Sequence, residues 1–310
     1  MCNDIQTDGA EALAKSLHHN SVLVSLRLNG NKIGNKGAMS IASMLQINNT
    51  LQELDLADCD LGTQGVVALA IVLNSNKSLH SINISRPLLF SHQEETIVHM
   101  SHMLSVNSTL RELHLGKMAL TDSGMERLAE GLHVNHSLRY LDLRCNRVTR
   151  DGAQCLAEVL KRSVTLEVID LSSNRIEDEG AVYLSEAIAW PACRLQALSI
   201  TSNNIGGEGL VSLAKALQIN RTLTHLYIWG NRLEEPVCQG FRELLASGRL
   251  PADNTDVSAY EVDGRVYLAE APHSLRRHYC WTPTQGQGGS PATNAPLAPK
   301  ANSPTNTALG

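Results

Sequence analysis

One stretch of the sequence reads Leu138-Arg-Tyr-Leu141-Asp-Leu143-Arg-Cys-Asn146-Arg-Val148, and its pattern decides the fold. The same phrase, Leu-x-x-Leu-x-Leu-x-x-Asn-x-Leu with substitutions, opens eight times at intervals of 28 to 31 residues. Its opening residues are Leu23, Leu51, Leu79, Leu110, Leu138, Leu166, Leu195 and Leu223. Repetition at this period over most of a chain is typical of a solenoid, in which each unit packs against its neighbours.

Each repeat predicts a short strand followed by a helix. Leu141 and Leu143 are two residues apart, so both point to one face of a strand. Leu156 and Leu160 have helical spacing, and Gly152 allows a close turn into that helix. Strands stack about 4.8 Å apart, whereas helices need roughly 8–10 Å. We therefore expect an α/β solenoid, a horseshoe with a parallel sheet on its concave face and helices on its convex face.

The ninth position of the phrase predicts a hydrogen-bond ladder. It is occupied by Asn31, Cys59, Pro87, Met118, Asn146, Asn174, Asn203 and Asn231. An asparagine there can bond backbone groups where the strand turns away, and stacked repeats would then satisfy buried amides. Cys59 is a weak substitute, and Pro87 and Met118 cannot take the role. Because the third repeat also has three extra residues, we expect an irregular loop over residues 85–95.

The repeat resembles the ribonuclease-inhibitor type of leucine-rich repeat, and the resemblance extends from Asn3 to about Leu250. This family includes ribonuclease inhibitors, the Ran GTPase-activating protein and the sensor domains of NACHT-type receptors. The resemblance implies a non-enzymatic binding horseshoe, and it does not name the partner.

The sequence predicts four segments. Residues 1–22 match only the second half of a repeat, and residues 23–250 hold the eight full repeats. In residues 251–281 the dipeptide Asp263-Gly264 favours a two-residue hairpin turn that would pair Tyr260 with Tyr267 and cap the array. Residues 282–310 are rich in Pro, Gly, Ser and Thr, which predicts a disordered tail.

Composition excludes several function classes. The formal net charge of −5 argues against a nucleic-acid surface, which needs a concentrated basic patch. The seven scattered cysteines fit reduced thiols, and the N-terminus has no signal-peptide pattern. No apolar run is long enough to span a membrane. We expect an intracellular protein, cytoplasmic or nuclear, that contacts neither a membrane nor nucleic acid directly.

Motifs for catalysis, metals or cofactors are weak. His99 and His102 have metal-ligand spacing, but they flank a buried helix position and are better explained as helix surface. Gly206-Gly207-Glu-Gly209 falls at the strand-to-helix turn of a repeat, where packing explains glycine better than phosphate binding. We therefore expect no enzyme activity, no metal and no cofactor.

The concave face is the predicted binding surface. Its side chains are positions three, five and seven of each phrase, and acidic residues predominate in the middle. Tyr227 and Trp229 are expected to face outward as exposed aromatic anchors. The alternative is that the C-terminal hairpin or the Trp281 segment covers them. The remaining candidates for partner contact are Tyr140, Asp142, Arg144 and His225, although the Asp of Leu-Asp-Leu is common in this repeat.

The predicted function is a protein-interaction scaffold that binds a neutral or basic protein partner on its concave face. Two alternatives stay open. One is a GTPase-activating regulator like the Ran GTPase-activating protein, although that family has a long acidic C-terminal segment and this chain does not. The other is a structural subunit of a large ciliary or nucleolar assembly.

Overall fold

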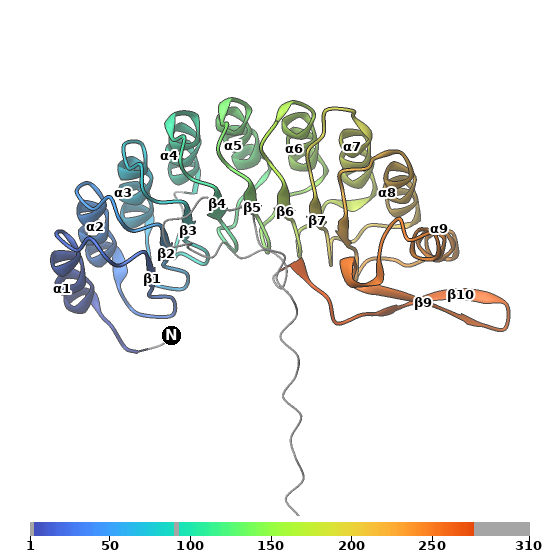
Figure 1. Cartoon of the computed structure of the whole chain (residues 1–310), viewed down its shortest axis with the longest axis horizontal. Coiled ribbons are helices and arrows are strands. Elements are labelled where there is room, and N and C mark those ends of the chain that lie inside the picture. The colour runs from blue at the N-terminus through green and yellow to red at the C-terminus, as the bar shows by residue number, and fades with distance from the viewer. Residues whose placement is uncertain (1–2, 90–92, 276–310) are drawn as a thin grey trace, which may run out of the picture.

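The computed structural model describes residues 3–89 and 93–275 and confirms the horseshoe. Eight strands pair side by side in chain order, all parallel. In Figure 1 the strands line the inner curve and the helices form the outer one. None of the helices in this part of the chain is long and apolar enough to cross a membrane.

Every repeat supplies one strand of three residues and one helix. The strands are β1 Ser25–Arg27, β2 Glu53–Asp55, β3 Ser81–Asn83, β4 Glu112–His114, β5 Tyr140–Asp142, β6 Val168–Asp170, β7 Ala197–Ser199 and β8 His225–Tyr227. The helices are α1 Thr7–Leu17, α2 Gly34–Leu45, α3 Thr63–Leu73, α4 Gln93–Val106, α5 Asp122–Val134, α6 Arg150–Arg162, α7 Glu177–Ala189, α8 Gly207–Ile219 and α9 Glu235–Ala246. After them come a 3-10 turn, Ala252–Asn254, and a hairpin of β9 Val257–Val262 and β10 Arg265–Glu270.

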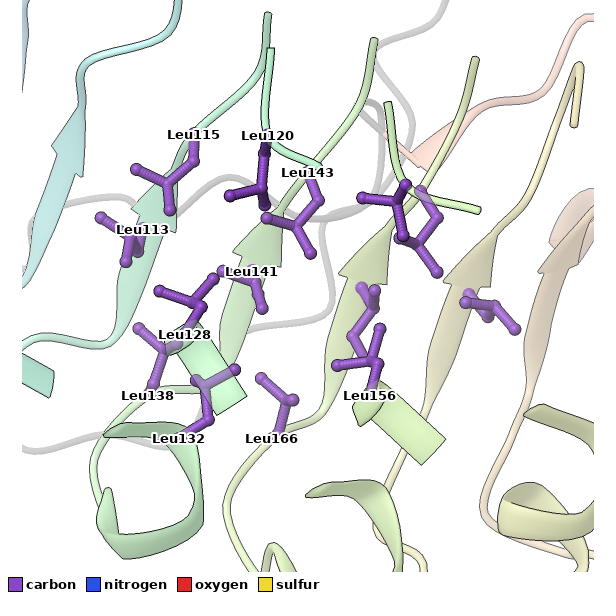
Figure 2. Packing of buried hydrophobic residues seen from close by; sticks show 14 of the residues in the cluster. Leu113, Leu115, Leu120, Leu128, Leu132, Leu138, Leu141, Leu143, Leu156 and Leu166 are labelled. Carbon is purple, nitrogen blue, oxygen red and sulfur yellow. The ribbon is translucent and has the colours of Figure 1, made fainter. Parts of the chain in front are cut away.

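The core lies between the sheet and the helices. Figure 2 shows Leu141 and Leu143 of one repeat with Leu128 and Leu132 of the preceding helix, so each leucine fills space shared by neighbours. The strand leucines and isoleucines from β2 to β8 are at most 1% exposed, as the phrase predicts. Burial of this shared apolar layer is the main stabilising contribution in such an array.

At the N-terminal edge of the sheet, the predicted burial of one core residue, Leu26, is wrong. Leu26 on β1 is only half-buried, and Leu23 before it is 37% exposed. In the described part of the chain, no strand pairs with the outer side of β1, and the isolated bridge from Gln6 to Lys32 lies beyond the end of β1. Leu26 therefore lacks the neighbour that buries its counterparts.

The asparagine ladder forms as predicted. Asn174 Nδ2 donates to the carbonyl oxygens of Leu143 (3.0 Å) and Leu171 (2.8 Å), and its Oδ1 accepts the Val148 N–H (3.1 Å). Asn31, Asn146, Asn203 and Asn231 make related bonds. Cys59 replaces one rung by donating its thiol to the Leu28 carbonyl oxygen at 3.0 Å. The ladder satisfies backbone groups that burial would otherwise leave unpaired.

The C-terminal hairpin has the predicted register. Tyr260 pairs with Tyr267, with ring centroids 5.6 Å apart, and both Asp263 (φ 51°) and Gly264 (φ 76°) have the positive φ that a type I′ turn requires. Buried hairpin side chains join the main core beyond α9: Val257, Val266 and Leu268. Asp256, just before β9, accepts the backbone N–H groups of Ile228 (2.8 Å) and Trp229 (3.0 Å). The hairpin thus caps the hydrophobic core after the last repeat, and the Asp256 carboxylate pairs with backbone N–H groups at the end of β8.

The described residues include only part of the predicted irregular loop and only part of the predicted C-terminal region. Residues 85–89 of the predicted irregular loop form neither helix nor strand, α4 begins at Gln93, and residues 90–92 lie outside the described residues. Trp281 and the predicted tail over residues 282–310 also lie outside them.

Candidate functional site

The strand register arranges the outward side chains of the sheet in two rows. Position three of each phrase gives Ser25, Glu53, Ser81, Glu112, Tyr140, Val168, Ala197 and His225, each paired in register with the next. Position five gives Arg27, Asp55, Asn83, His114, Asp142, Asp170, Ser199 and Tyr227. The rows are polar over β1 to β4 and become partly apolar from β5 onward.

At the middle of the concave face lies a group of five ionisable residues, which we call the central charged cluster: Glu112, His114, Asp142, Arg144 and Asp170. Asp142 is 0% exposed. Its Oδ2 lies 3.2 Å from His114 Nδ1 and 2.5 Å from a guanidinium nitrogen of Arg144, and both contacts are ion pairs when His114 is protonated. Asp142 Oδ1 also accepts the Arg144 backbone N–H at 3.0 Å. A buried carboxylate with this many donors is compensated for its loss of water.

The two edges of the cluster are looser. His114 Nε2 lies 3.7 Å from Glu112 Oε2, and Arg144 Nη1 lies 3.9 Å from Asp170 Oδ2. Asp170 Oδ1 instead accepts the Ser172 hydroxyl at 2.6 Å, and that hydroxyl is 2.7 Å from the Ser199 hydroxyl. The cluster therefore continues as a chain of polar contacts from β4 to β7.

Burial and neighbouring charges set the ionisation of the cluster. Burial opposes the charged form of His114, but the hydrogen bonds and charges of Asp142 and Glu112 outweigh it and raise its pKa to about 9. Burial, followed by the charge of Asp142, raises the pKa of Asp170 above its ordinary value. His114 is thus a cation at neutral pH, and it links the acidic side chains on both sides of it.

The predicted exposure of Tyr227 is wrong, and the second aromatic candidate, Tyr140, is buried as well. Tyr140 is 5% exposed and Tyr227 1% exposed. Both belong to an apolar cluster that is separate from the main core, made of Tyr140, Val168, Ala197, Tyr227 and Leu275. The physical reason is the chain segment after β10, which places Leu275 over the outward side of β5 to β8. This resembles the alternative in which a C-terminal segment covers the aromatics.

Trp229 is expected to project into solvent beside Tyr227, and the structure places it differently. Trp229 is half-buried and packs against the main core rather than standing beside Tyr227 in solvent. Its backbone N–H is held by Asp256. His225 is also half-buried, with Nδ1 2.8 Å from the Thr224 hydroxyl. Of the six candidates, the structure brings Tyr140, Asp142 and Arg144 together at β5 and sets Tyr227 across the apolar cluster from them.

A cleft of about 390 Å³ lies between the charged and apolar clusters. Arg144, Asp170, Thr201, Tyr227 and Leu275 are among the residues that line it. A second hollow, of about 700 Å³, lies on the convex side between α4 and α5. Across residues 3–89 and 93–275, no group of three or more His, Cys, Asp or Glu side chains is placed to hold a metal ion.

Two residues of this region have no signal in the repeat pattern. Leu275 lies 25 residues after Leu250, in a segment that follows no period, so its place on the sheet depends on tertiary packing. Asp256 likewise takes its role from the end of the array, where its carboxylate substitutes for the strand that a further repeat would provide. A short acidic side chain shortly after the last repeat is the one feature that could have indicated it.

Comparison with known proteins agrees with the repeat pattern. The leucine-rich repeat family model matches residues 1–14, 19–42, 48–70, 106–129, 134–157, 162–185 and 193–214. Leucine-rich repeat-containing protein 34 of Mus musculus is 49% identical over 217 residues, which cover 70% of this chain and 52% of that protein. The Homo sapiens protein of the same name is 51% identical over 218 residues, 70% of this chain and 47% of that protein.

The chain therefore spans about half the length of the curated relatives it matches. Among solved structures, the tropomodulin C-terminal domain of Caenorhabditis elegans superimposes with a TM-score of 0.43 and 14% identity. That superposition covers 49% of this chain and 92% of the domain.

Proposed function

Because the chain belongs to the leucine-rich repeat family, whose members generally act as protein-interaction scaffolds, we propose that it binds a protein partner on its concave face without catalysing a reaction. The observation that carries the proposal is the central charged cluster. Its side chains are held in place by one another on the inner curve, and a cleft opens beside them. Pre-ordered polar groups at the centre of a concave surface lose little conformational freedom when a partner binds.

The charge of the face favours a neutral or basic partner. The two outward rows together with Arg144 carry five carboxylates, on Glu53, Asp55, Glu112, Asp142 and Asp170. Opposite them stand three cations, on Arg27, Arg144 and the protonated His114. The excess of acid would steer a basic protein surface toward the inner curve and repel nucleic-acid phosphates. We propose no direct contact with nucleic acid or membrane.

The cysteines favour an intracellular location, in the cytoplasm or the nucleus. Cys59 is buried and uses its thiol proton to bond the Leu28 carbonyl oxygen, a contact that only the reduced residue can make. Burial also raises the pKa of this thiol to about 11, so it stays protonated and unreactive. A reducing compartment preserves such a residue.

The proposal is tested by blocking the face without touching its ion pairs. Thr201 lines the cleft, and Thr201→Arg adds bulk and a positive charge there. The matched control, Gln154→Arg, adds the same charge to an exposed position of α6 on the convex side. In capture of binding proteins from cell extract, we expect Thr201→Arg to reduce retention of the bound protein at least tenfold and Gln154→Arg to leave it unchanged.

A photocrosslinking amino acid gives an independent readout. Placed at Ser172 on the concave face it should form an adduct with the captured protein, and placed at the exposed Met39 on α2 it should not. Equal retention by both arginine variants, with adducts only from Met39, would assign binding to the convex side and refute the proposal.

A further inference from the structure

The segment that follows the hairpin returns to the sheet. We call residues 271–275 the C-terminal strap. Figure 1 shows the chain leaving β10 and running back to the inner curve near β6 and β7. There Leu275, only 2% exposed, joins Tyr140, Val168, Ala197 and Tyr227. The strap thus occupies part of the same face that the proposed function assigns to a partner.

The strap is held by few polar contacts. The Ala271 N–H donates to the Asp256 carbonyl oxygen at 2.8 Å, and His273 Nε2 lies 3.7 Å from Asp253 Oδ1. Within the strap itself, the His273 N–H donates to the Ala271 carbonyl oxygen at 2.8 Å. In the described residues the strap pairs with no strand. Among the described residues, it is the side chain of Leu275 that joins the strap to the apolar cluster on the concave face.

What Leu275 covers has the composition of a binding patch. Tyr140, Val168 and Ala197 form one in-register row across β5 to β7, and all three residues of each of these strands are buried. Buried aromatic side chains are typical of the centre of protein interfaces. The central charged cluster borders this patch, and its three carboxylates, Glu112, Asp142 and Asp170, exceed its two cations, His114 and Arg144, by one charge.

The sequence around Leu275 complements that surface. Leu275 is followed directly by Arg276 and Arg277, the one place in the chain where two arginines are adjacent. An aliphatic side chain suits the apolar cluster, and positive charges suit the neighbouring carboxylates. Leu275 therefore shows, within the chain itself, that this face accepts an aliphatic side chain.

We propose that the C-terminal strap is a built-in competitor. The partner presents an extended segment with an aliphatic side chain followed by basic residues, and this segment replaces Leu275 on Tyr140, Val168 and Tyr227. The partner binds only when the strap leaves. This inference rests on the proposed concave binding face and adds the chemistry of the partner and a means of regulating access. Tethering gives the strap a local concentration on the order of millimolar, so it hinders weak partners most.

The test uses the full chain and a fluorescently labelled peptide of residues 270–281, with serine in place of Cys280. Leu275→Glu in the protein releases the strap, and Val262→Glu places the same charge on an exposed side chain of the hairpin as a matched control. Binding is measured by fluorescence anisotropy at low salt. We expect Leu275→Glu to bind the peptide at least tenfold more tightly than the wild-type chain or Val262→Glu.

The peptide itself is varied to test its chemistry. Replacing its leucine by glutamate, or both of its arginines by glutamates, should each weaken binding to the Leu275→Glu protein at least tenfold. If the Leu275→Glu protein has a lower melting temperature than wild type, Leu275→Ser releases the strap with a smaller perturbation, and the same tenfold gain is expected.

Three results would overturn the proposal. One is equal peptide binding by wild type and both strap variants. Another is binding that the charge-reversed peptide retains. The third is a wild-type dimer that Leu275→Glu converts to a monomer, measured by light scattering, which would assign the strap to a second copy of the chain. Failure here leaves the Thr201→Arg test unaffected, so loss of the strap proposal and loss of the proposed function are told apart.

Discussion

The two halves of the concave sheet are built from the same repeated phrase, but they differ in their outward side chains and in how their ends are covered. Over β1 to β4 the outward rows are polar, and the sheet ends on β1 with Leu26 half-buried. Over β5 to β8 the rows contain Tyr140, Val168, Ala197 and Tyr227, and non-repeat residues close the end. Asp256 bonds the backbone after β8, and Leu275 covers the apolar row.

The difference shows that the repeated phrase determines which side chains are buried on the inward side of the sheet. Burial on the outward side and at the two ends depends on residues outside the phrase. Inward leucines are interchangeable between repeats because each meets the same neighbours. Outward residues and terminal strands meet different surroundings in each half, so their burial depends on what lies beyond the repeat.

The largest expected effect comes from removing an inward leucine. Leu141→Ala on β5 should lower the free energy of unfolding by about 2–5 kcal/mol, because it leaves a cavity in a fully packed layer. Leu26→Ala on β1 should cost less than about 1.5 kcal/mol, since that side chain already contacts water. Urea denaturation of both variants makes the comparison. Equal losses would show that β1 is as well covered as β5.

The asparagine ladder should show the next largest effect. Asn174→Ala should destabilise the chain by about 1–3 kcal/mol, because two carbonyl oxygens and one N–H lose a partner in a buried site. Cys59→Ala removes one weak thiol bond from the corresponding rung and should cost less than about 1 kcal/mol. Thermal and urea melts check the order. A wild-type melt for Asn174→Ala would refute the role of the ladder in stability.

The ion pair between His114 and Asp142, which joins the two halves of the sheet, should make the stability of the fold depend on pH. His114 on β4 donates to Asp142 on β5, and its pKa rises from 6.5 in the unfolded chain to about 9 in the folded one. A raised histidine pKa stabilises the fold fully below pH 6.5, and that stabilisation is lost as pH increases through 9. The free energy of unfolding should therefore fall by about 1–3 kcal/mol from pH 6.5 to 9.5. His114→Gln should remove most of this slope, and an unchanged slope would contradict the assignment.

The smallest expected effect is local. Backbone amides of residues 23–30 around β1 should exchange hydrogen at least tenfold faster than those of residues 138–171, because among the described residues β1 pairs with a strand on one side only. Hydrogen-exchange mass spectrometry on the full chain measures both segments together. Equal protection would mean that α1 shields the edge as well as a strand would.

The sequence predicts the horseshoe, the inward leucines, the asparagine ladder and the Tyr260–Tyr267 register, because all of these depend on local spacing. Three aspects of the site could not be predicted. Tyr140 and Tyr227 point outward as their phase requires, yet Leu275 buries them from a segment that has no period. The His114–Asp142–Arg144 contacts depend on side-chain geometry between repeats 28 residues apart. Asp256 gains its role only because the array ends at β8.

The in-register pairing of the strands also sets the size of what the face can recognise. From β5 to β8 there are three interstrand spacings of about 4.8 Å, a span of roughly 14 Å. An extended peptide crosses that distance in about four residues, and its side chains on one side recur every ~6.6 Å, out of step with the strands. A peptide laid across these strands can therefore seat about two side chains. Such a short contact favours rapid exchange of segments, and lasting attachment would need a second point of contact on the same partner.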